Sequence, residues 1–414
     1  MVVGNIAGID IGSSKICTVI GRVDEGRIAS ILGVGQAASR GVQKGVIVDL
    51  EDATRAIRES IDRAQGDSVP KVRWAVVGFS GKHISSTNPM VSVDTRRRDH
   101  LVTEVALAQA DRKIQSVVFP DDREKVQIIR RHYALDRIEG IKNPLGMHGF
   151  RLDLEAHIVT ADYAYMQNLR LCLERAGVPY TRDSFVASCL ASSEAVLEPE
   201  DKQSGVIVAD IGGGTTGIAV YRDGSIWHTS ALPVGGRQVT NDLAVGLNIP
   251  FSAAEDLKLK AGSLYPERMV DGAAAELMGK YNTSAEEVCY IIRARMEELL
   301  RMVVSKSPYV PNLLVLTGGG SKLEGLEQFT REITGLQVRV GIPRVLPEDG
   351  TGLDDPAYAA VVGLLLWGSE REAAEEVAAA MGLKGLYSGL RSTLQAIWAR
   401  RPRISFGPPS EGER

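Results

Sequence analysis

Two short segments of the chain combine an aspartate with glycine and hydroxyl residues in a pattern that suits phosphate binding. They are Gly8-Ile9-Asp10-Ile11-Gly12-Ser13-Ser14-Lys15 and Ala209-Asp210-Ile211-Gly212-Gly213-Gly214-Thr215-Thr216. Glycine lets backbone N–H groups approach a phosphate without a Cβ in the way, and nearby hydroxyls can donate to its oxygens. The carboxylates of Asp10 and Asp210 are suited to hold Mg²⁺, mostly through its water molecules.

The surroundings of the two segments are similar, which indicates an internal duplication. Each hairpin follows an apolar run and leads into a second predicted strand, residues 16–23 and 217–221. Val34-Gly35 and Val234-Gly235 are interpreted as matching pairs farther along. Either hairpin alone is compatible with an ordinary turn. Their repetition at matched spacing favours two related domains that clamp one nucleotide between them.

Further glycine-rich segments are candidates for the same pocket. The apolar run 313–316 ends in Thr317-Gly318-Gly319-Gly320-Ser321, and the N-terminus of a helix predicted from Glu324 would face the nucleotide. Gly235-Gly236 precedes a helical pattern, and Glu255 and Lys258 lie on a second predicted helix. For these last two features, a helix entry and a surface i,i+3 ion pair are each more common explanations than a ligand contact.

Composition restricts the class of protein. The 414 residues, 44% hydrophobic and 24% charged, are typical of a folded protein with two domains. A net charge of -4 gives no global basic field for nucleic acid. The four cysteines are widely separated, which argues against a zinc site and fits a reducing cytoplasm. The longest apolar run, residues 357–367, is about half the length that a bilayer requires, so we expect no membrane-spanning helix.

The order of these motifs resembles the actin, Hsp70 and sugar-kinase superfamily. That resemblance implies an α/β fold with duplicated RNase H-like (actin-like) domains and ATP between them. A more specific similarity, in the first domain, is to the inserted subdomain of FtsA, the actin homologue that links division filaments to the bacterial membrane. The segments that carry it are residues 76–84, 120–124, 140–147 and 156–160, with further matches at 233–236, 254–258, 355–358 and 363–365.

The FtsA resemblance also implies a division of labour along the chain. Residues 1–82 and 161–203 would form the first actin-like domain, 83–160 an insert that contributes to polymers, and 204–368 the second domain. The second domain would dock the C-terminal tail of FtsZ, and later division proteins would join at midcell on the cytoplasmic side of the membrane. A solvated basic face explains any single candidate contact as well. The candidates are Asn241, Arg293, Arg301, Lys306 and Lys322.

One segment departs from the family pattern. Where many relatives carry an acidic or amide residue followed by proline near the γ-phosphate, this chain has Ser188-Cys189, with Glu194 farther along. A serine can orient water but is a poor general base unless assisted. We therefore expect ATP binding with at most weak hydrolysis, with Ser188 and Glu194 as candidate catalytic residues. The serine also argues against a small-molecule kinase.

The C-terminal region predicts a membrane anchor. Residues 369–382 read as a helical spacer, 383–401 as an amphipathic helix without acidic residues, and 402–414 as a disordered tail. At about 100° per residue, the apolar side chains of 383–401 fall within an arc of about 120°. Such a helix suits an anionic membrane surface, although packing on the protein's own core is an alternative. The predicted membrane contacts are Leu386, Leu390, Arg391, Leu394, Ile397, Trp398, Arg400 and Arg401.

Other members of the superfamily fit less well. An Hsp70 chaperone needs a large substrate domain after the ATPase, whereas only some 45 residues follow Gly368. A pilus-assembly relative of FtsA shares a similar insert and stays open as an alternative. The basic amphipathic segment at 383–401 favours FtsA.

Overall fold

The computed structural model of the chain describes residues 4–24, 27–66, 69, 71–95, 99–269, 272–343 and 352–380. Its contacts group into two compact units. The larger unit comprises Met1–Pro89, Val117–Arg131 and Ala156–Glu372, and the smaller one includes Met90–Ser116 and His132–Glu155. Both phosphate hairpins therefore belong to the larger unit.

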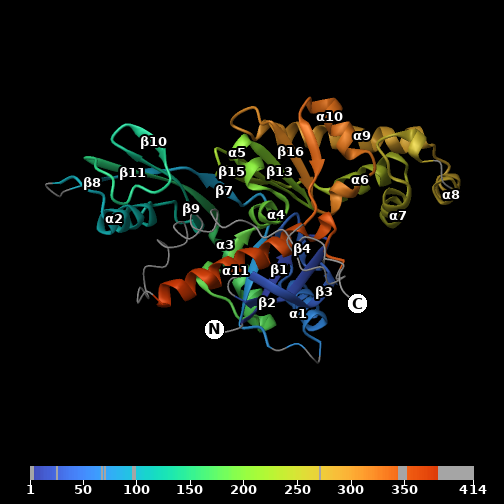
Figure 1. The fold of residues 1–414 in the computed structure, drawn as a ribbon. Coiled ribbons are helices and arrows are strands. Elements are labelled where there is room, and N and C mark those ends of the chain that lie inside the picture. Colours follow the sequence, from blue (N-terminus) through green and yellow to red (C-terminus); the bar gives the residue numbers. More distant parts are fainter. Residues whose placement is uncertain are drawn as a thin grey trace, which may run out of the picture. The chain divides into compact units, whose positions relative to one another are not determined.

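The first sheet of the larger unit has five strands in the order β12-β6-β1-β2-β3 (Figure 1). Its first three strands in sequence form an antiparallel meander; β6 then pairs in parallel with β1, and β12 pairs in parallel with β6. The strands are β1 (Gly4–Ile11), β2 (Lys15–Asp24), β3 (Arg27–Ala38), β6 (Trp74–Phe79) and β12 (Phe185–Ala187).

The second sheet repeats this topology in the order β15-β14-β13-β16-β17. Again three antiparallel strands come first, and two parallel strands follow beside the first of them. The shared topology confirms the predicted duplication. The strands are β13 (Val206–Ile211), β14 (Thr216–Arg222), β15 (Ser225–Leu232), β16 (Leu313–Thr317) and β17 (Gln337–Val340).

Strand register corrects one detail of the predicted duplication. Ile16 pairs with Ala37 in the first sheet, and the equivalent Thr216 pairs with Leu232 in the second. Val34-Gly35 therefore lies inside β3, whereas Val234-Gly235 follows the end of β15. The proposed match between these two pairs is wrong. Glycine is required at position 35 for a different reason: a Cβ there would lie 2.0 Å from the carbonyl oxygen of Ser60 in α1 (Leu50–Gln65).

Helices separate and cover the strands of the larger unit. Local signals set their ends. Asp49 caps the helix that begins at Leu50, and a Ser284–Glu287 capping box starts the helix Ala285–Ser305. The helices are α1 (Leu50–Gln65), α3 (Tyr163–Ala176), α4 (Ser188–Val196), α5 (Pro199–Ser204), α6 (Gly236–Gly246), α7 (Phe251–Ala261), α8 (Gly272–Lys280), α9 (Ala285–Ser305) and α10 (Leu326–Thr334).

Short elements complete the larger unit. A two-stranded hairpin, β4 (Val42–Gln43) and β5 (Val46–Ile47), precedes α1. Single 3₁₀ turns lie before β12, after α7, after β16 and before the last helix. They are η1 (Arg182–Ser184), η2 (Pro266–Arg268), η3 (Gly319–Lys322) and η4 (Pro356–Tyr358).

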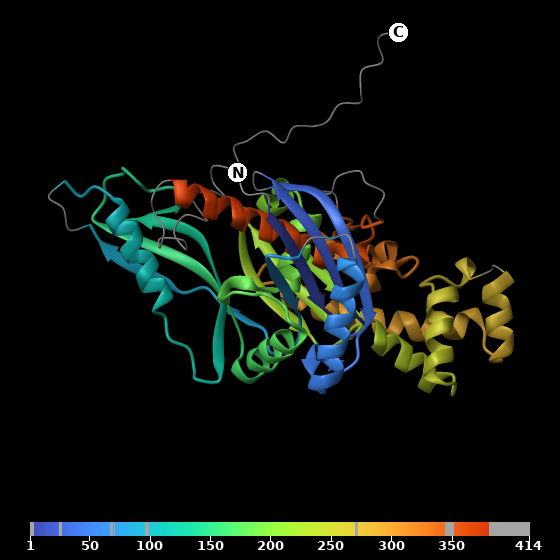
Figure 2. The ribbon, with the colours of Figure 1, turned by 90° about the horizontal axis from the view of Figure 1, so that it is seen from below.

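The last described helix, α11 (Ala359–Ala380), packs against the first sheet (Figure 2). A Cβ at Gly8 of β1 would lie 2.8 Å from the carbonyl oxygen of Val361, so the helix and strand approach closely. The predicted spacer, 369–382, begins within this helix, and its first residues are packed, because Ser369 is 3% exposed and Arg371 lies over the Trp74 ring. No helix among residues 4–380, as far as they are described, could span a bilayer. The predicted membrane helix, 383–401, and the tail, 402–414, lie outside the described residues.

The smaller unit is built from the middle of the predicted insert. It contains β8 (Met90–Asp94), α2 (Glu104–Gln115) and β10 (Ile138–Ile141). Two long strands, β9 (Arg123–Leu135) and β11 (Arg151–Asp162), run through both units. At the larger unit's end, β11 pairs with β7 (Ser85–Thr87), and farther along it pairs with β8.

Candidate functional site

Asp10 and Asp210 occupy equivalent places near the ends of the central strands of the two sheets. Asp10 lies beside Gly78 of the parallel neighbour β6, and Asp210 lies beside Thr317 of the parallel neighbour β16. Both carboxylates are only partly exposed. The duplicated topology thus places two acidic groups at the same point of each half, as two clamps on one ligand require.

The two predicted phosphate hairpins meet at their tips. A Cβ on Gly213 would lie 1.8 Å from Ser14 Oγ, and one on Gly214 would lie 2.8 Å from Ser13 Oγ. The close approach explains why glycine is needed at both positions. The structure therefore brings together the two segments that the sequence separates by about 200 residues.

Internal contacts shape each hairpin. A Cβ on Gly12 would lie 2.7 Å from the carbonyl oxygen of Lys15, and the Gly212 amide donates to the carbonyl of Thr215 over 2.9 Å. Thr216 is fully buried, and its hydroxyl donates to the carbonyl of Val234 over 2.8 Å. In this structure the Thr216 hydroxyl therefore stabilises the turn after β15 rather than pointing to a free phosphate position.

Lys15 lies at the start of β2, close to the first carboxylate. Its ammonium is 4.3 Å from the centre of the Tyr358 ring, and the Tyr358 hydroxyl accepts a hydrogen bond from the Gln36 amide. Burial raises the pKa of Asp10, and the Ser188 hydrogen bond and the positive charge of Lys15 partly offset that increase. Lys15 is thus a cation held near Asp10 by the Tyr358 ring of η4, which Gln36 of β3 holds in turn.

The third glycine-rich loop adjoins the second carboxylate. Gly318 has φ +79, and a Cβ there would lie 2.3 Å from Asp210 Oδ1. A Cβ on Gly320 would lie 2.4 Å from Ile211 Cγ2, and the hydroxyl of Ser321 donates to the Gly318 carbonyl over 2.8 Å. The segment Gly318–Ser321 is therefore part of the same site. Its helix starts later than predicted, because η3 intervenes and α10 begins at Leu326 instead of Glu324.

The N-terminus of α6 supports the second hairpin. The amide of Gly236 donates to the Gly212 carbonyl over 2.9 Å, and the amide of Arg237 donates to the Gly213 carbonyl over 2.7 Å. A Cβ on Gly235 would lie 2.5 Å from the Gly212 carbonyl. Gly235 and Gly236 are thus close to the site, but these amides already have acceptors.

Glu255 and Lys258 form the predicted ion pair, and it lies at the same helix N-terminus. The Lys258 ammonium is 2.8 Å from Glu255 Oε2 and 2.9 Å from Thr240 Oγ1, and it also donates to the Gly236 carbonyl over 3.3 Å. Its side chain is 13% exposed. The pair therefore connects α7 to α6 next to the hairpin, which is more than a surface contact.

A cavity of ≈ 370 Å³ opens beside the hairpin tips. Ser13 and Gly214 line it together with Lys44 and Arg237, so its mouth carries positive charge that suits phosphates. Sequence reasoning missed both cations. Only the fold brings Lys44 in the β4–β5 turn to the hairpins, whereas Arg237 directly follows Gly235-Gly236, which the sequence already assigned to the pocket. Asn241, predicted to contact a partner, also lines this cavity.

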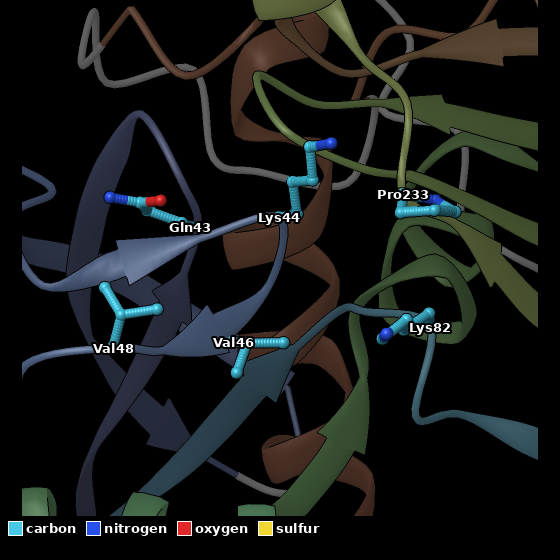
Figure 3. Close-up of a pocket in the computed structure, with 6 residues that line it drawn as sticks. All are labelled: Gln43, Lys44, Val46, Val48, Lys82 and Pro233. Carbon is cyan, nitrogen blue, oxygen red and sulfur yellow. The ribbon is translucent and has the colours of Figure 1, made fainter.

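A second cavity of ≈ 350 Å³ shares Gln43 and Lys44 with the first. Figure 3 shows Lys44 and Lys82 approaching it from two separate loops, with Val46, Val48 and Pro233 as apolar lining. This neighbouring cavity extends the positively charged rim of the site.

Helix α4 supplies hydrogen-bond donors to both carboxylates. The Ser188 hydroxyl donates to Asp10 Oδ1 over 2.9 Å, and the Ser192 hydroxyl donates to Asp210 Oδ2 over 2.5 Å. Burial nevertheless raises the pKa of the Asp210 carboxyl to about 7, with the charge of Asp10 adding to the increase. Sequence reasoning missed Ser192, although its spacing of four from Ser188 on a helix was an available signal.

Glu194 has a different environment. Its carboxylate is 2.8 Å from the ammonium of Lys202 on α5. Glu194 follows Ser192 by two residues, so on a helix the two side chains point to nearly opposite sides. The structure therefore does not bring Glu194 to the two aspartates.

The donor set fits a hydrated divalent cation. Each serine occupies one oxygen of a carboxylate, so Asp10 Oδ2 and Asp210 Oδ1, the latter next to Gly318, are the candidate metal ligands, and hard oxygen donors suit Mg²⁺. Throughout the described part of the chain, no three or more His, Cys, Asp or Glu side chains cluster as a complete metal site. Such an ion would therefore depend on water and phosphate oxygens as well.

The remaining predicted partner residues have varied surroundings. Arg293 donates to the carbonyl of Leu264 over 3.0 Å and lies over the Phe329 ring, so it stabilises the second half. Arg301 forms an exposed pair with Glu297, and Lys322 pairs with Asp355. Lys306 is the C-cap residue of α9.

Family models match two parts of the chain. The model described as "Cell division protein FtsA" matches residues 207–363, and "SHS2 domain inserted in FTSA" matches residues 81–160. The FtsA proteins of Pseudomonas aeruginosa and Escherichia coli (strain K12) are 34% and 31% identical to the chain. The first comparison covers 89% of this chain and 90% of the relative, and the second covers 93% and 97%.

Solved structures share the fold at low sequence identity. The "PilM-PilN type IV pilus biogenesis complex" gives a TM-score of 0.58 at 17% identity, covering 89% of this chain and 99% of the other. MreB5 of Spiroplasma citri bound to AMPPNP gives 0.52 at 12% identity, covering 91% and 99%. Together with the two matching sheets, they confirm the predicted actin-like α/β fold.

Proposed function

The chain belongs to the FtsA family of cell-division proteins, and from this premise we propose the function of this member. It binds ATP with Mg²⁺ between its two actin-like halves and polymerises on the inner face of the cytoplasmic membrane. Through a C-terminal amphipathic helix it tethers FtsZ filaments to that membrane at midcell. In this way it helps to assemble the division ring, which later division proteins join.

The observation that carries the proposal is the meeting of the two hairpins in one site. Asp10 and Asp210 lie at equivalent strand ends, and the tips Ser13-Ser14 and Gly213-Gly214 approach within contact distance. A ligand that bridges both hairpins would therefore contact both halves at once. Nucleoside triphosphates have the length and the negative charge for this, and the cations at the cavity mouth complement them.

Within this site each group has a distinct proposed role. The hydroxyls of Ser13, Ser14 and Thr215 donate to phosphate oxygens, and Lys15 neutralises their charge. Asp10 and Asp210 hold the hydrated Mg²⁺, which offsets the charge of the phosphates when it is bound. The Gly318–Ser321 loop and the Glu255–Lys258 pair extend the site away from the phosphates.

We expect slow turnover of the bound ATP. Ser188 replaces the acidic or amide residue of many relatives, and its hydroxyl donates a hydrogen bond to Asp10. A hydroxyl in this arrangement is a poor base for an attacking water. Glu194 cannot substitute for it from its position beside Lys202. ATP would thus act as a structural ligand that holds the two halves together.

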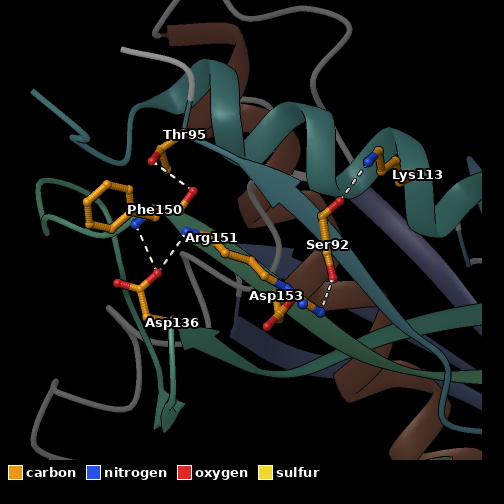
Figure 4. A network of polar contacts seen from close by, with 7 residues as sticks. All are labelled: Ser92, Thr95, Lys113, Asp136, Phe150, Arg151 and Asp153. Carbon is orange, nitrogen blue, oxygen red and sulfur yellow. Dashed lines mark hydrogen bonds and ion pairs between the residues drawn. The ribbon is translucent and has the colours of Figure 1, made fainter. Parts of the chain in front are cut away.

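The inserted subdomain is internally braced, which suits a contact module. Asp136, at φ +56 between β9 and β10, accepts hydrogen bonds from the amides of Phe150 and Arg151 over 2.9 Å each (Figure 4). Arg151 donates to the Ser92 hydroxyl over 2.7 Å, and Lys113 donates to the Ser92 carbonyl over 2.6 Å. This network joins β8, α2 and β11 to the turn between β9 and β10.

The same subdomain exposes apolar side chains. Ile138 on the edge strand β10 is 65% exposed, and Phe150 is 66% exposed. Edge strands and exposed apolar groups are typical of surfaces that pair with another chain. We propose that this surface contributes to the contact between successive subunits of the polymer.

The second half offers a surface for the FtsZ tail peptide. Val245 on α6, Leu259 on α7 and Tyr290 on α9 are 74%, 69% and 75% exposed. Arg301 and Lys306 near the end of α9 add positive charge that complements an acidic peptide. We propose that the peptide binds over these helices.

We propose that stable membrane attachment needs many copies of the helix 383–401 to bind at once. A single amphipathic helix such as 383–401 binds a lipid surface weakly and reversibly. A polymer presents many copies at once, so that the second and later helices bind at a high effective concentration. ATP, polymer and membrane binding are therefore expected to support one another.

Liposome co-sedimentation tests this proposal directly. The full chain and a chain that ends at Gly382 are mixed with anionic vesicles and ATP, and an FtsZ tail peptide is titrated against both by fluorescence anisotropy. We expect the full chain to pellet, the shorter chain to stay in the supernatant, and both to bind the peptide. Uncharged vesicles are the control for the electrostatic part of the attraction.

The possible failures are separate. If neither chain pellets, the membrane tether is wrong and the helix packs elsewhere. If both chains pellet, residues 383–401 are not the anchor. If neither chain binds the peptide, the FtsZ link is wrong, and an assembly role like that of the structurally similar pilus protein gains support.

A further inference from the structure

Helix α4 buries three serine hydroxyls inside the larger unit. Ser188 is 4% exposed, and Ser192 and Ser193 have no exposed area. A buried hydroxyl destabilises the fold unless it finds a hydrogen-bond partner. The partners of these three groups therefore indicate what the helix is built to hold.

Two of the hydroxyls bond to the carboxylates of different halves of the molecule. Ser188 and Ser192 are four residues apart and thus lie on one face of the helix. Ser188 reaches Asp10 Oδ1 over 2.9 Å, and Ser192 reaches Asp210 Oδ2 over 2.5 Å. One turn of one helix therefore fixes an oxygen of both proposed Mg²⁺-binding carboxylates.

The helix itself has little freedom to shift. A Cβ on Gly217, the cross-strand partner of Asp210, would lie 2.8 Å from Cys189 Cβ. On the other side, a Cβ on Gly363 of α11 would lie 1.8 Å from the Ala191 carbonyl oxygen. Helix α4 is thus held between β14 and α11 by contacts that leave no room for a methyl group. A helix packed this tightly can set the position of what it bonds.

The single proton of Ser192 has two possible acceptors. Its Oγ lies 2.5 Å from Asp210 Oδ2 and 2.9 Å from the Ser188 carbonyl oxygen one turn earlier. A carboxylate is the stronger acceptor, because a charge-assisted hydrogen bond is shorter and stronger than one to a neutral oxygen. The proton therefore goes to Asp210, and its other oxygen is left for a ligand.

We propose that Ser192 is a positioning residue that orients the Asp210 carboxylate, so that Asp10 and Asp210 share one hydrated Mg²⁺ of the bound nucleotide. The proposal rests on the proposed nucleotide binding at this site. It predicts that loss of the Ser192 hydroxyl weakens the contribution of Mg²⁺ to ATP binding and leaves Mg²⁺-free ATP binding nearly unchanged.

Ser193 provides a matched control on the next residue. It is equally buried, and its hydroxyl donates to the Cys189 carbonyl one turn earlier over 2.6 Å. Its other contact is the hydroxyl of Tyr221, not a carboxylate of the site. Ser193→Ala therefore removes a buried hydroxyl from the same helix without touching Asp10 or Asp210.

The experiment measures ATP affinity of the full chain by calorimetry, with Mg²⁺ and with EDTA. Loss of a charge-assisted hydrogen bond predicts that Ser192→Ala weakens Mg²⁺·ATP binding about tenfold or more. In EDTA the affinity should change by less than about twofold, because the metal-bound carboxylate is no longer involved. Ser192→Cys, which keeps the size but donates weakly, should behave like Ser192→Ala, and Ser193→Ala like the wild type.

Several results would overturn the inference. They are equal losses with Mg²⁺ and with EDTA, equal losses in the Ser192 and Ser193 variants, or wild-type affinity in Ser192→Cys, which would point to packing alone. If the wild type binds Mg²⁺·ATP and Ser192→Ala binds it equally well, only the role of Ser192 is wrong. If the wild type binds no ATP, the nucleotide-binding proposal and this inference are both wrong.

Discussion

A buried histidine shows how single polar residues are held at the root of the insert. His157 of β11 has no exposed area, and its Nδ1 lies 2.7 Å from Asn88 Oδ1. Asn88 donates its own amide to the Trp227 carbonyl, so its oxygen faces the ring and Nδ1 carries the proton. Nε2 then accepts from the Thr229 hydroxyl over 2.8 Å. With a neutral imidazole, these bonds join β11 to β15 of the second half.

This arrangement predicts a dependence of stability on pH. Burial lowers the pKa of His157 to about 3, whereas an unfolded histidine titrates near pH 6.5. Between these values the unfolded state binds the extra proton, so this residue's share of stability is lost as the pH falls from about 6.5. His157→Gln should flatten the slope by up to about 1.4 kcal/mol per pH unit.

Thermal melts of both proteins at pH 7.5 and pH 5 measure this slope. The exposed residue His148 supplies the control, since His148→Gln should keep the wild-type profile. His83, whose pKa burial also lowers to about 3, still contributes to the slope in each variant. A His157→Gln profile parallel to that of the wild type would contradict the assignment of a neutral, buried imidazole.

At the scale of elements, glycines set how closely the segments around the site pack. Gly363 of α11 faces the backbone of α4, and Gly8 of β1 faces the backbone of α11. These contacts place α11 directly behind the helix that bonds Asp10 and Asp210. The first turns of α11 are therefore packed together with the site.

Gly363→Ala tests this packing. The new Cβ would lie 1.8 Å from the Ala191 carbonyl oxygen, and backbone cannot yield as a flexible side chain can. We expect a loss of about 1–3 kcal/mol in unfolding free energy, as for other overpacked cores. Gly279→Ala in α8, where a Cβ would meet nothing within 4 Å, should be neutral or stabilise by up to about 1 kcal/mol. Urea unfolding compares them, and equal midpoints would contradict the close contact.

The sequence predicts those elements whose signals are local. Asp10 and Asp210 with their glycine hairpins could be found because the chain itself repeats them, and the matching sheets confirm that repeat. The Val34-Gly35 match failed because a two-residue pattern carries no strand register. Lys44 was missed because its place at the site depends on how distant segments pack. Ser192 and Arg237, by contrast, had local signals in their spacing from Ser188 and Gly236. The predicted membrane contacts from Leu386 to Arg401 stay predictions.

At the scale of the whole molecule, duplication gives the site its chemistry. Each half alone offers one carboxylate and one hairpin, and only their meeting makes a clamp. The two halves then differ in what is inserted: a mixed α/β subdomain after β6 in the first, and the helices α6 to α9 before β16 in the second. A ligand at the shared site could thus influence both the proposed polymer contact surface and the proposed peptide-binding surface.

The most direct test of this account is the binding of Mg²⁺·ATP to the wild type, to Asp210→Ala and to Asp256→Ala, measured by calorimetry. Asp256 is an exposed carboxylate of the same half, so it controls for a general change of charge. We predict that Asp210→Ala lowers the affinity at least about tenfold, since a ligand of the metal is lost, and that Asp256→Ala leaves it unchanged. Equal affinities in all three proteins would contradict the assignment of the site.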